Sequence, residues 1–141
     1  MNAHKLLSLS KTELDDLFAK SPAGPIPDGV AKGTAIITPG TPFTPEIAEI
    51  INLFAWQGKV FNAQKGVLVN RITVFGLDAI LARVDKEASW VDGGECIVLD
   101  YSQTSIVAHW VRDEMRMVGE KLYLGTVFWD KTRLIYFALQ F

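Results

Sequence analysis

The sequence predicts a mainly β protein, an antiparallel up-and-down barrel with one or two N-terminal helices. From residue 56 onward, segments rich in β-branched and aromatic residues follow one another. Short stretches of turn residues separate many of these segments, as expected for hairpins between antiparallel neighbours; they lie at 92–94, 102–105, 119–121 and 129–132. A long meander leaves two unpaired edges unless it closes on itself. Closure into a barrel is therefore expected.

Length and composition indicate one domain of 141 residues, with a helical part carrying one short strand at 1–55 and antiparallel strands at 56–141. Hydrophobic residues make up 49% and charged residues 21%, a balance typical of a compact fold. The net charge of -2 and the scattered basic residues argue against nucleic-acid binding. One cysteine permits no internal disulfide, and no apolar run is long enough for a membrane span, so a cytoplasmic location is expected.

The first helix is predicted by the stretch "LSKTEL". Ser10 is suited to cap a helix at about 11–19, with Glu13 reaching back to the Ser10 amide and Leu9 and Leu14 at the two staple positions. The following "SPAGPIPDG" has three prolines and two glycines, so it cannot continue the helix. We expect it to be an extended surface connector.

A short strand, "GTAIITPG", precedes a second helix signal. Thr44 is suited to cap that helix and Pro45 to occupy its first position, with apolar residues at helical spacing as far as Phe54. We expect this helix, at 45–55, to serve as a lid or plug at one end of the barrel. An α+β roll of the cystatin or helix-grip sort, in which a curved sheet wraps a helix, is the competing interpretation. The lack of a long C-terminal helix weakens it, but a roll with helices only at the N-terminus stays open.

Residues 105–118, "SIVAHWVRDEMRMV", combine apolar and ionisable residues in one predicted strand. Alternate side chains of a strand point to opposite faces. One set is Ile106, Ala108, Trp110, Arg112, Glu114 and Arg116; the other is Val107, His109, Val111, Asp113, Met115 and Met117. We expect the second, more apolar set to face inward, where His109 and Asp113 would orient a ligand between apolar walls.

The first set is expected to be a solvated face with charges paired across neighbouring strands. A bulge would exchange the two faces, so Trp110 and Arg112 are second-rank pocket candidates, and an inward arginine would suggest an anionic ligand.

Two other strands can be sorted in the same way. In "ECIVLDYS" the set Ile97, Leu99 and Tyr101 is expected inward, where Tyr101 would offer an aromatic wall with a hydroxyl. In "KLYLGTVFW" both sets are apolar, which predicts that a helix or a second subunit covers the outer side. A homodimer is therefore one possible assembly.

The stretches "GTAIITPGTP", "WQGKVF", "SWVDGGECIVLDYS" and "VRDEMRMVGEKLYLGTVFW" resemble small bacterial lipocalin-like (calycin-type) proteins, most of undefined function. The resemblance implies a barrel that encloses an apolar ligand. The chain departs from true lipocalins because it lacks their Gly-x-Trp opening strand near the N-terminus; here Trp56 precedes Gly58.

Two functions of different class are consistent with these patterns. The first is binding of a small apolar or amphipathic molecule by Tyr101, His109, Asp113, Met115 and Met117. The second is a small cofactor-free isomerase, hydratase or decarboxylase that uses His109 and Asp113 as acid and base. No cofactor or metal is expected, because phosphate-loop glycine patterns and metal-ligand spacing are both absent from the sequence. A serine triad is disfavoured, since His109 and Asp113 lie four residues apart on one strand, roughly 13 Å.

Overall fold

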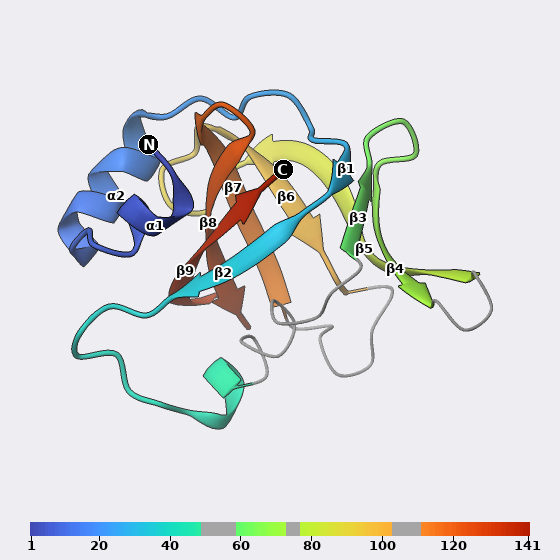
Figure 1. Ribbon diagram of the computed structural model, residues 1–141. Helices are drawn as coiled ribbons and strands as arrows, with labels where there is room; N and C mark the ends of the chain where they lie inside the picture. The colour runs from blue at the N-terminus through green and yellow to red at the C-terminus, as the bar shows by residue number, and fades with distance from the viewer. Residues whose placement is uncertain (49–58, 73–76, 103–110) are drawn as a thin grey trace.

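The computed structural model describes residues 1–48, 59–72, 77–102 and 111–141. Within these ranges, nine antiparallel strands form one sheet in the order β1-β3-β4-β5-β6-β7-β8-β9-β2, which curls into a nearly closed barrel (Figure 1). The predicted mainly β, antiparallel architecture is confirmed. The elements are α1 (Ala3–Leu6), α2 (Lys11–Lys20), β1 (Gly29–Val30), β2 (Lys32–Ile36), β3 (Lys59–Asn62), β4 (Val67–Ile72), β5 (Leu77–Ala88), β6 (Glu95–Asp100), β7 (Val111–Gly119), β8 (Leu122–Trp129) and β9 (Thr132–Gln140).

One short segment closes the barrel. β1 pairs with β3 at one edge of the sheet, and β2 pairs with β9 at the other, with Ala31 alone between β1 and β2. Both edges of the sheet therefore meet in residues 29–36, and the edge problem of a long meander is largely removed. The sequence indicated a strand here, but it did not reveal that residues before 56 complete the barrel.

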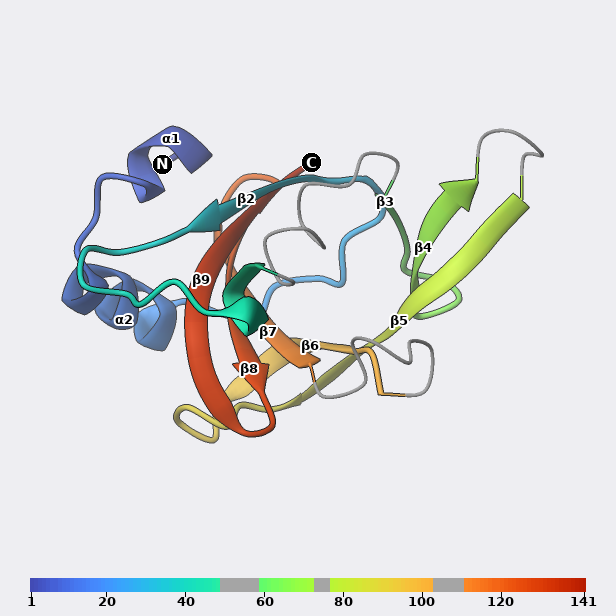
Figure 2. The same ribbon diagram turned by 90° about the horizontal axis from the view of Figure 1, so that it is seen from below.

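The longest strand bends the sheet. β5 pairs with β4 through Leu77–Arg83 and with β6 through Arg83–Ala88, so Arg83 is where it passes from one partner to the other. A register shift between Leu68 and Val69 adds an irregularity of the kind that increases local twist. Figure 2 shows β4 and the first half of β5 extending away from the rest of the barrel.

The hairpin turns follow the predicted turn residues. Asp130 and Lys131 connect β8 to β9 with φ of 47° and 69°, the two positive values that a two-residue type I′ turn requires. Gly93, in the predicted turn at 92–94, has φ of 74°. The predicted turn at 102–105 falls mostly outside the described residues.

The N-terminal helices cover the outer face of β8 and β9 (Figure 1). The predicted capping box is present: the Ser10 hydroxyl accepts from the Glu13 amide at 3.1 Å, and the Glu13 carboxylate accepts from the Ser10 amide at 3.0 Å. The apolar cluster beneath the helices explains why both faces of β8 are apolar. Its fully buried members include Leu6, Leu14, Phe18, Leu122 and Leu124. In the described part of the chain, neither helix is long and apolar enough to cross a membrane.

The proline-rich connector at 21–28 does more than run over the surface. Ala23 is buried in the inner core, the Met117 amide donates to the carbonyl of Pro22 at 3.0 Å, and the Tyr123 hydroxyl donates to the carbonyl of Pro25 at 2.7 Å. Proline has no N–H but keeps its carbonyl, so an extended proline segment can accept hydrogen bonds from strand ends. The connector thus packs onto one end of the barrel.

The helix expected at 45–55 is described only over residues 45–48. It begins as predicted, because the Thr44 hydroxyl accepts a hydrogen bond from the Ile47 amide at 3.3 Å. Ile47 is buried in the inner core, so this first turn packs into the barrel. The remainder of the predicted helix lies outside the described residues.

Candidate functional site

The inner faces of β6 and β7 form the candidate site. In the pairing of these strands Leu99 lies opposite Asp113, and Ile97 lies opposite Met115. Leu99, Ile97 and Met115 all belong to the inner core. Asp113 alternates with Met115 along β7 and therefore points to the same side. The expected sorting of this strand into an inward and an outward set agrees with the structure over residues 111–117.

A tyrosine and an aspartate are bonded to each other within this apolar interior. The Tyr101 hydroxyl donates to Oδ2 of Asp113 at 3.1 Å, and the two residues are 2% and 1% exposed. Tyr101 immediately follows β6, and its side chain reaches Asp113 diagonally, a direction that aromatic side chains can span between neighbouring strands. Burial, followed by the charge of Asp113, raises the pKa of Tyr101 well above its usual value. Tyr101 therefore keeps its proton and remains a donor.

Asp113 differs from the other buried charged residues in the side that it faces. Within the described ranges the buried charged side chains are Asp113, Glu114 and Arg116, and only Asp113 shares the inner face of β7. Among the described residues, the apolar side chains packed in the same inner core include Val111, Met115 and Val127. A carboxylate in such surroundings is costly unless it is hydrogen-bonded, and the Tyr101 hydroxyl supplies one such bond.

Met117 marks the end of the inner face. It is partly buried and packs against the inner core, and the connector backbone lies directly over it. A Cβ added at Gly24 would approach Cβ of Met117 to 2.6 Å, and Gly24 also has φ of 72°. Both observations explain why glycine occupies this position.

The other candidate residues lie elsewhere or are not described. His109 and Trp110 fall in 103–110, outside the described residues. Arg112 lies on the outer side, because β7 pairs in regular register from Val111 to Met117 and its only irregularity comes after Met117. Its guanidinium contacts the Glu114 carboxylate at 3.1 Å and lies 4.2 Å from the Trp90 ring centre.

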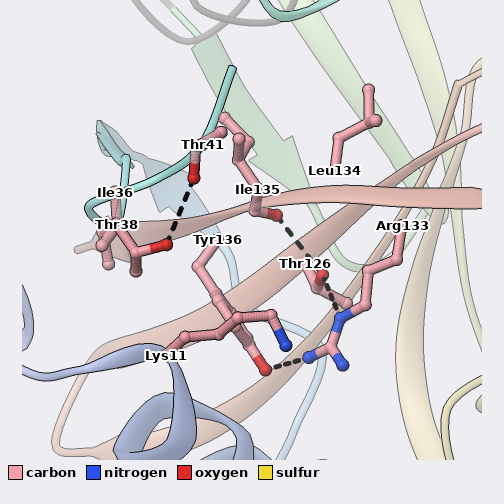
Figure 3. Close-up of a pocket in the computed structure, with 9 residues that line it drawn as sticks. All are labelled: Lys11, Ile36, Thr38, Thr41, Thr126, Arg133, Leu134, Ile135 and Tyr136. Carbon is pink, nitrogen blue, oxygen red and sulfur yellow. Dashed lines mark hydrogen bonds between the residues drawn. The ribbon is translucent and has the colours of Figure 1, made fainter.

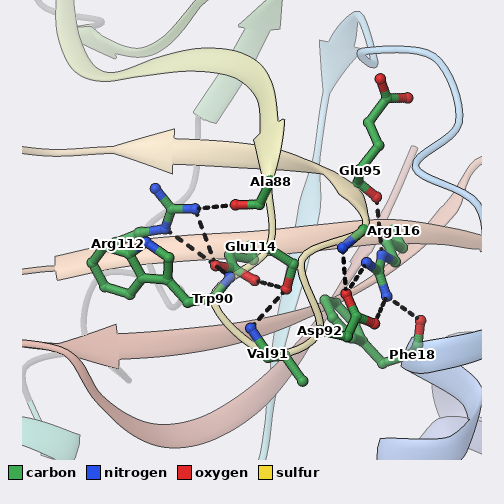
Figure 4. Close-up of polar contacts among 11 residues, drawn as sticks. Phe18, Ala88, Trp90, Val91, Asp92, Glu95, Arg112, Glu114 and Arg116 are labelled. Atoms are coloured by element: carbon green, nitrogen blue, oxygen red, sulfur yellow. Dashed lines mark hydrogen bonds and ion pairs between the residues drawn. The ribbon is translucent and has the colours of Figure 1, made fainter.

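The outer face of β7 is not solvated, which corrects the expectation from sequence. Glu114 is 0% exposed and accepts hydrogen bonds from the Ser89 hydroxyl at 2.5 Å, the Trp90 amide at 2.7 Å and the Arg112 guanidinium (Figure 4). The hairpin loop at 89–94, between β5 and β6, folds back over β7 and excludes water from this face. Sequence alternation shows which side a residue faces but not what covers that side.

Arg116 is the second anchor of this loop. It is 2% exposed, binds both carboxylate oxygens of Asp92, and donates to the main-chain carbonyls of Phe18 at 2.9 Å and Glu95 at 3.1 Å (Figure 4). The Arg116 guanidinium lowers the pKa of Asp92 to about 2. The polar groups of Glu114 and Arg116 are thus bound to the loop at 89–94 and to α2, where they stabilise the fold. The inner face of β7 therefore remains as the candidate site.

Cys96 lies beside the outer polar groups and is buried. Burial, reinforced by the charge of Glu114, raises the pKa of its thiol to about 12. A thiol that stays protonated is a poor nucleophile. Over the described ranges, no three His, Cys, Asp or Glu residues gather as a metal site would require.

A groove opens at the end of the barrel that the connector covers. Its volume is about 340 Å³, and it lies between connector residues such as Ile26 and the side chains of Tyr123 and Phe141. Tyr123 belongs to the inner core, and Phe141 packs against that core with its ring 5.7 Å from Tyr123. Tyr123 and Phe141 therefore line the groove and also contact the inner core.

Comparisons with known proteins support the fold. No protein family model and no curated protein matches the chain. The crystal structure of a protein from Thermomonospora curvata is similar, with a TM-score of 0.61 over 99% of this chain and 98% of that one, at 17% sequence identity. At this identity the similarity establishes a shared architecture, a nearly closed antiparallel β-barrel.

Proposed function

We propose that the barrel binds a small apolar or amphipathic molecule on its inner face. The Tyr101–Asp113 pair, buried among apolar side chains, is the observation that carries this proposal. Apolar walls with a few placed polar groups are typical of small-molecule sites. A carboxylate can accept several hydrogen bonds, so a ligand whose polar end carries a hydroxyl or amine donor is the kind that Asp113 would bind.

The barrel topology supports the same proposal. If residues 29–36 are counted as one strand broken at Ala31, the described strands form a nearly closed meander of eight strands. Eight strands are the number found in lipocalin barrels, which hold one small ligand. A calycin-type barrel, expected from the sequence, is thus part of the proposal. The groove beside Tyr123 and Phe141, two residues in contact with the inner core, is the proposed route of entry.

Ligand binding can be tested by thermal shift with a library of apolar alcohols, amines and carboxylates. A molecule that binds only the folded protein raises its melting temperature. We expect hits with the wild type, loss of these hits in Met115→Trp, which fills the inner face, and weaker hits in Tyr101→Phe and Asp113→Asn. Asp85→Asn, which makes the same change at an exposed position of β5, should keep every hit.

Circular dichroism first establishes that each variant is folded. The proposal is wrong if the library yields no hit with the wild type, or if folded Asp113→Asn and Met115→Trp both retain the hits unchanged. The cofactor-free enzyme, with His109 and Asp113 as acid and base, remains a hypothesis that the same hits can test. Conversion of a hit by the wild type but not by His109→Ala would favour catalysis over simple binding.

A further inference from the structure

A second pocket lies on the outer wall of the barrel, where α2 meets β2 and β9 (Figure 3). Its volume is about 180 Å³, and its polar lining consists of Lys11, Thr38, Thr41, Thr126, Arg133 and Tyr136. Tyr136 belongs to the helix-covered cluster rather than to the inner core. Ile135 of its apolar lining belongs to the inner core, but none of its polar side chains belongs to the inner-face site, so a role for them is independent of the function proposed for that site.

Arg133 is held in this pocket through two of its three guanidinium nitrogens. Nε donates to the Thr126 hydroxyl at 3.0 Å, and Nη2 contacts the Tyr136 hydroxyl and the Asp15 carboxylate. Among the residues that the structure describes, none accepts a hydrogen bond from Nη1. The Arg133 side chain is 26% exposed, and this burial lowers its pKa from the ordinary value.

The pocket also carries an excess of positive charge. Lys11 lies 3.0 Å from Asp15, so Lys11 and Arg133 share a single carboxylate. Figure 3 shows the ends of both side chains next to the Tyr136 hydroxyl. Lys11 is the first residue of α2, where a positive charge opposes the helix dipole and does not favour the helix. Its ion pair with Asp15, four residues further along, offsets this within the helix, and the same side chain lines the pocket.

We propose that this pocket binds a small oxyanion, either a carboxylate or a phosphate group. The guanidinium fork supplies directed donors, the Lys11 ammonium supplies a second charge, and the hydroxyl pair of Thr38 and Thr41 supplies a neutral donor. These two hydroxyls form a hydrogen bond of 3.2 Å with each other, in which only one of the two protons is used. The small volume selects a compact anionic group rather than a large ligand.

The test is titration of the wild-type protein with inorganic phosphate and, separately, with acetate, at constant ionic strength with sodium chloride as balance. Isothermal calorimetry and NMR shifts report saturable binding. We expect Lys11→Gln to weaken binding about 2- to 5-fold, as for a solvent-exposed ion pair. Arg133→Gln should weaken it about 10-fold or more, because charge-assisted hydrogen bonds to the guanidinium are lost.

Lys65→Gln, which removes an exposed lysine from the turn between β3 and β4, is the matched control and should bind as the wild type does. Lys11 is exposed, so its variant should fold even if Arg133→Gln does not. Saturation by phosphate alone assigns the pocket to phosphorylated compounds, and saturation by acetate as well extends it to carboxylates. The proposal is overturned if neither anion saturates the wild type, or if Lys11→Gln and Lys65→Gln bind equally.

Discussion

Arg116 on β7 and Asp92 in the β5–β6 hairpin are joined by two hydrogen bonds, of 2.8 Å from Nη1 and 2.7 Å from Nη2. The same guanidinium donates to the carbonyl of Phe18 near the end of α2 and lies 4.5 Å from the Phe18 ring centre. One side chain thus attaches a hairpin loop and a helix to the barrel wall. These groups stabilise the fold from the outer face of β7, opposite the face that carries the candidate ligand site.

The first prediction concerns acid. Asp92 has a pKa of about 2 in the folded protein against an ordinary value of 3.8, so the folded state favours its ionised form. Its contribution to stability is complete above pH 3.8 and is lost as the pH falls toward 2. We expect Asp92→Asn to reduce the free energy of unfolding by about 1 to 2 kcal/mol at neutral pH, allowing for partial exposure. Urea denaturation from neutral pH to pH 2 measures this difference, which should shrink with acid.

Asp16→Asn is the control for that experiment, because it makes the same change at an exposed position of α2. Its effect should be small at every pH. A difference between wild type and Asp92→Asn that stays constant down to pH 2 would contradict the assigned role of the Arg116–Asp92 pair.

The second prediction concerns Glu114, which is fully buried and accepts from Ser89, Trp90 and Arg112. Removing its charge leaves the half-exposed Glu87 carboxylate, 4.0 Å from Nη1, to balance the largely buried Arg112 guanidinium. Glu114→Gln should therefore destabilise the protein by about 3 kcal/mol. Urea denaturation of Glu114→Gln, Ser89→Ala and the double variant provides a mutant cycle. The two effects should be less than additive, and simple additivity would show that the Ser89 bond to Glu114 is energetically unimportant.

The third prediction concerns a glycine that makes room for an aromatic ring. Gly125 on β8 lies opposite Phe137 on β9, and a Cβ at Gly125 would overlap the Phe137 ring. Phe137 is 0% exposed within the inner core, so moving its ring disturbs the neighbouring core side chains. Gly125→Ala should cost about 1 to 3 kcal/mol, as overpacking of a core does. In a Phe137→Leu background the added cost should be much smaller; equal costs in both backgrounds would refute the steric explanation.

The sequence predicted the strands well because their signals are local. Alternation along β7 also sorted Val111, Asp113 and Met115 from Arg112 and Glu114 correctly, since the period of a strand does not depend on its surroundings. The sequence alone therefore predicted which side chains of β7 face the interior.

What covers each face was not predictable in the same way. The charges of Glu114 and Arg116 suggested water, but a loop that includes Asp92 buries them. The turn residues at 92–94 indicated a hairpin, but they did not indicate over which face of the sheet its loop folds. The pocket around Arg133 was also missed, because its members come from α2, β8, β9 and the segment after β2 and share no spacing in the sequence.

The last prediction tests the Tyr101–Asp113 pair without a ligand. Burial and the charge of Asp113 raise the pKa of Tyr101 well above its ordinary value of 10.0, so the folded state keeps the phenol protonated. Above pH 10 the unfolded chain releases this proton and the folded protein does not, so this one group lowers the free energy of unfolding by about 1.4 kcal/mol per pH unit. Urea denaturation between pH 8 and 11 should therefore show a steeper loss of stability in the wild type than in Tyr101→Phe.

Tyr123→Phe serves as the comparison, because burial also raises the pKa of Tyr123 but no carboxylate adds to that shift. This change should therefore flatten the pH profile of stability less. If Tyr101→Phe and wild type lose stability in parallel, Tyr101 ionises freely in the folded protein and the buried donor at the candidate site does not exist.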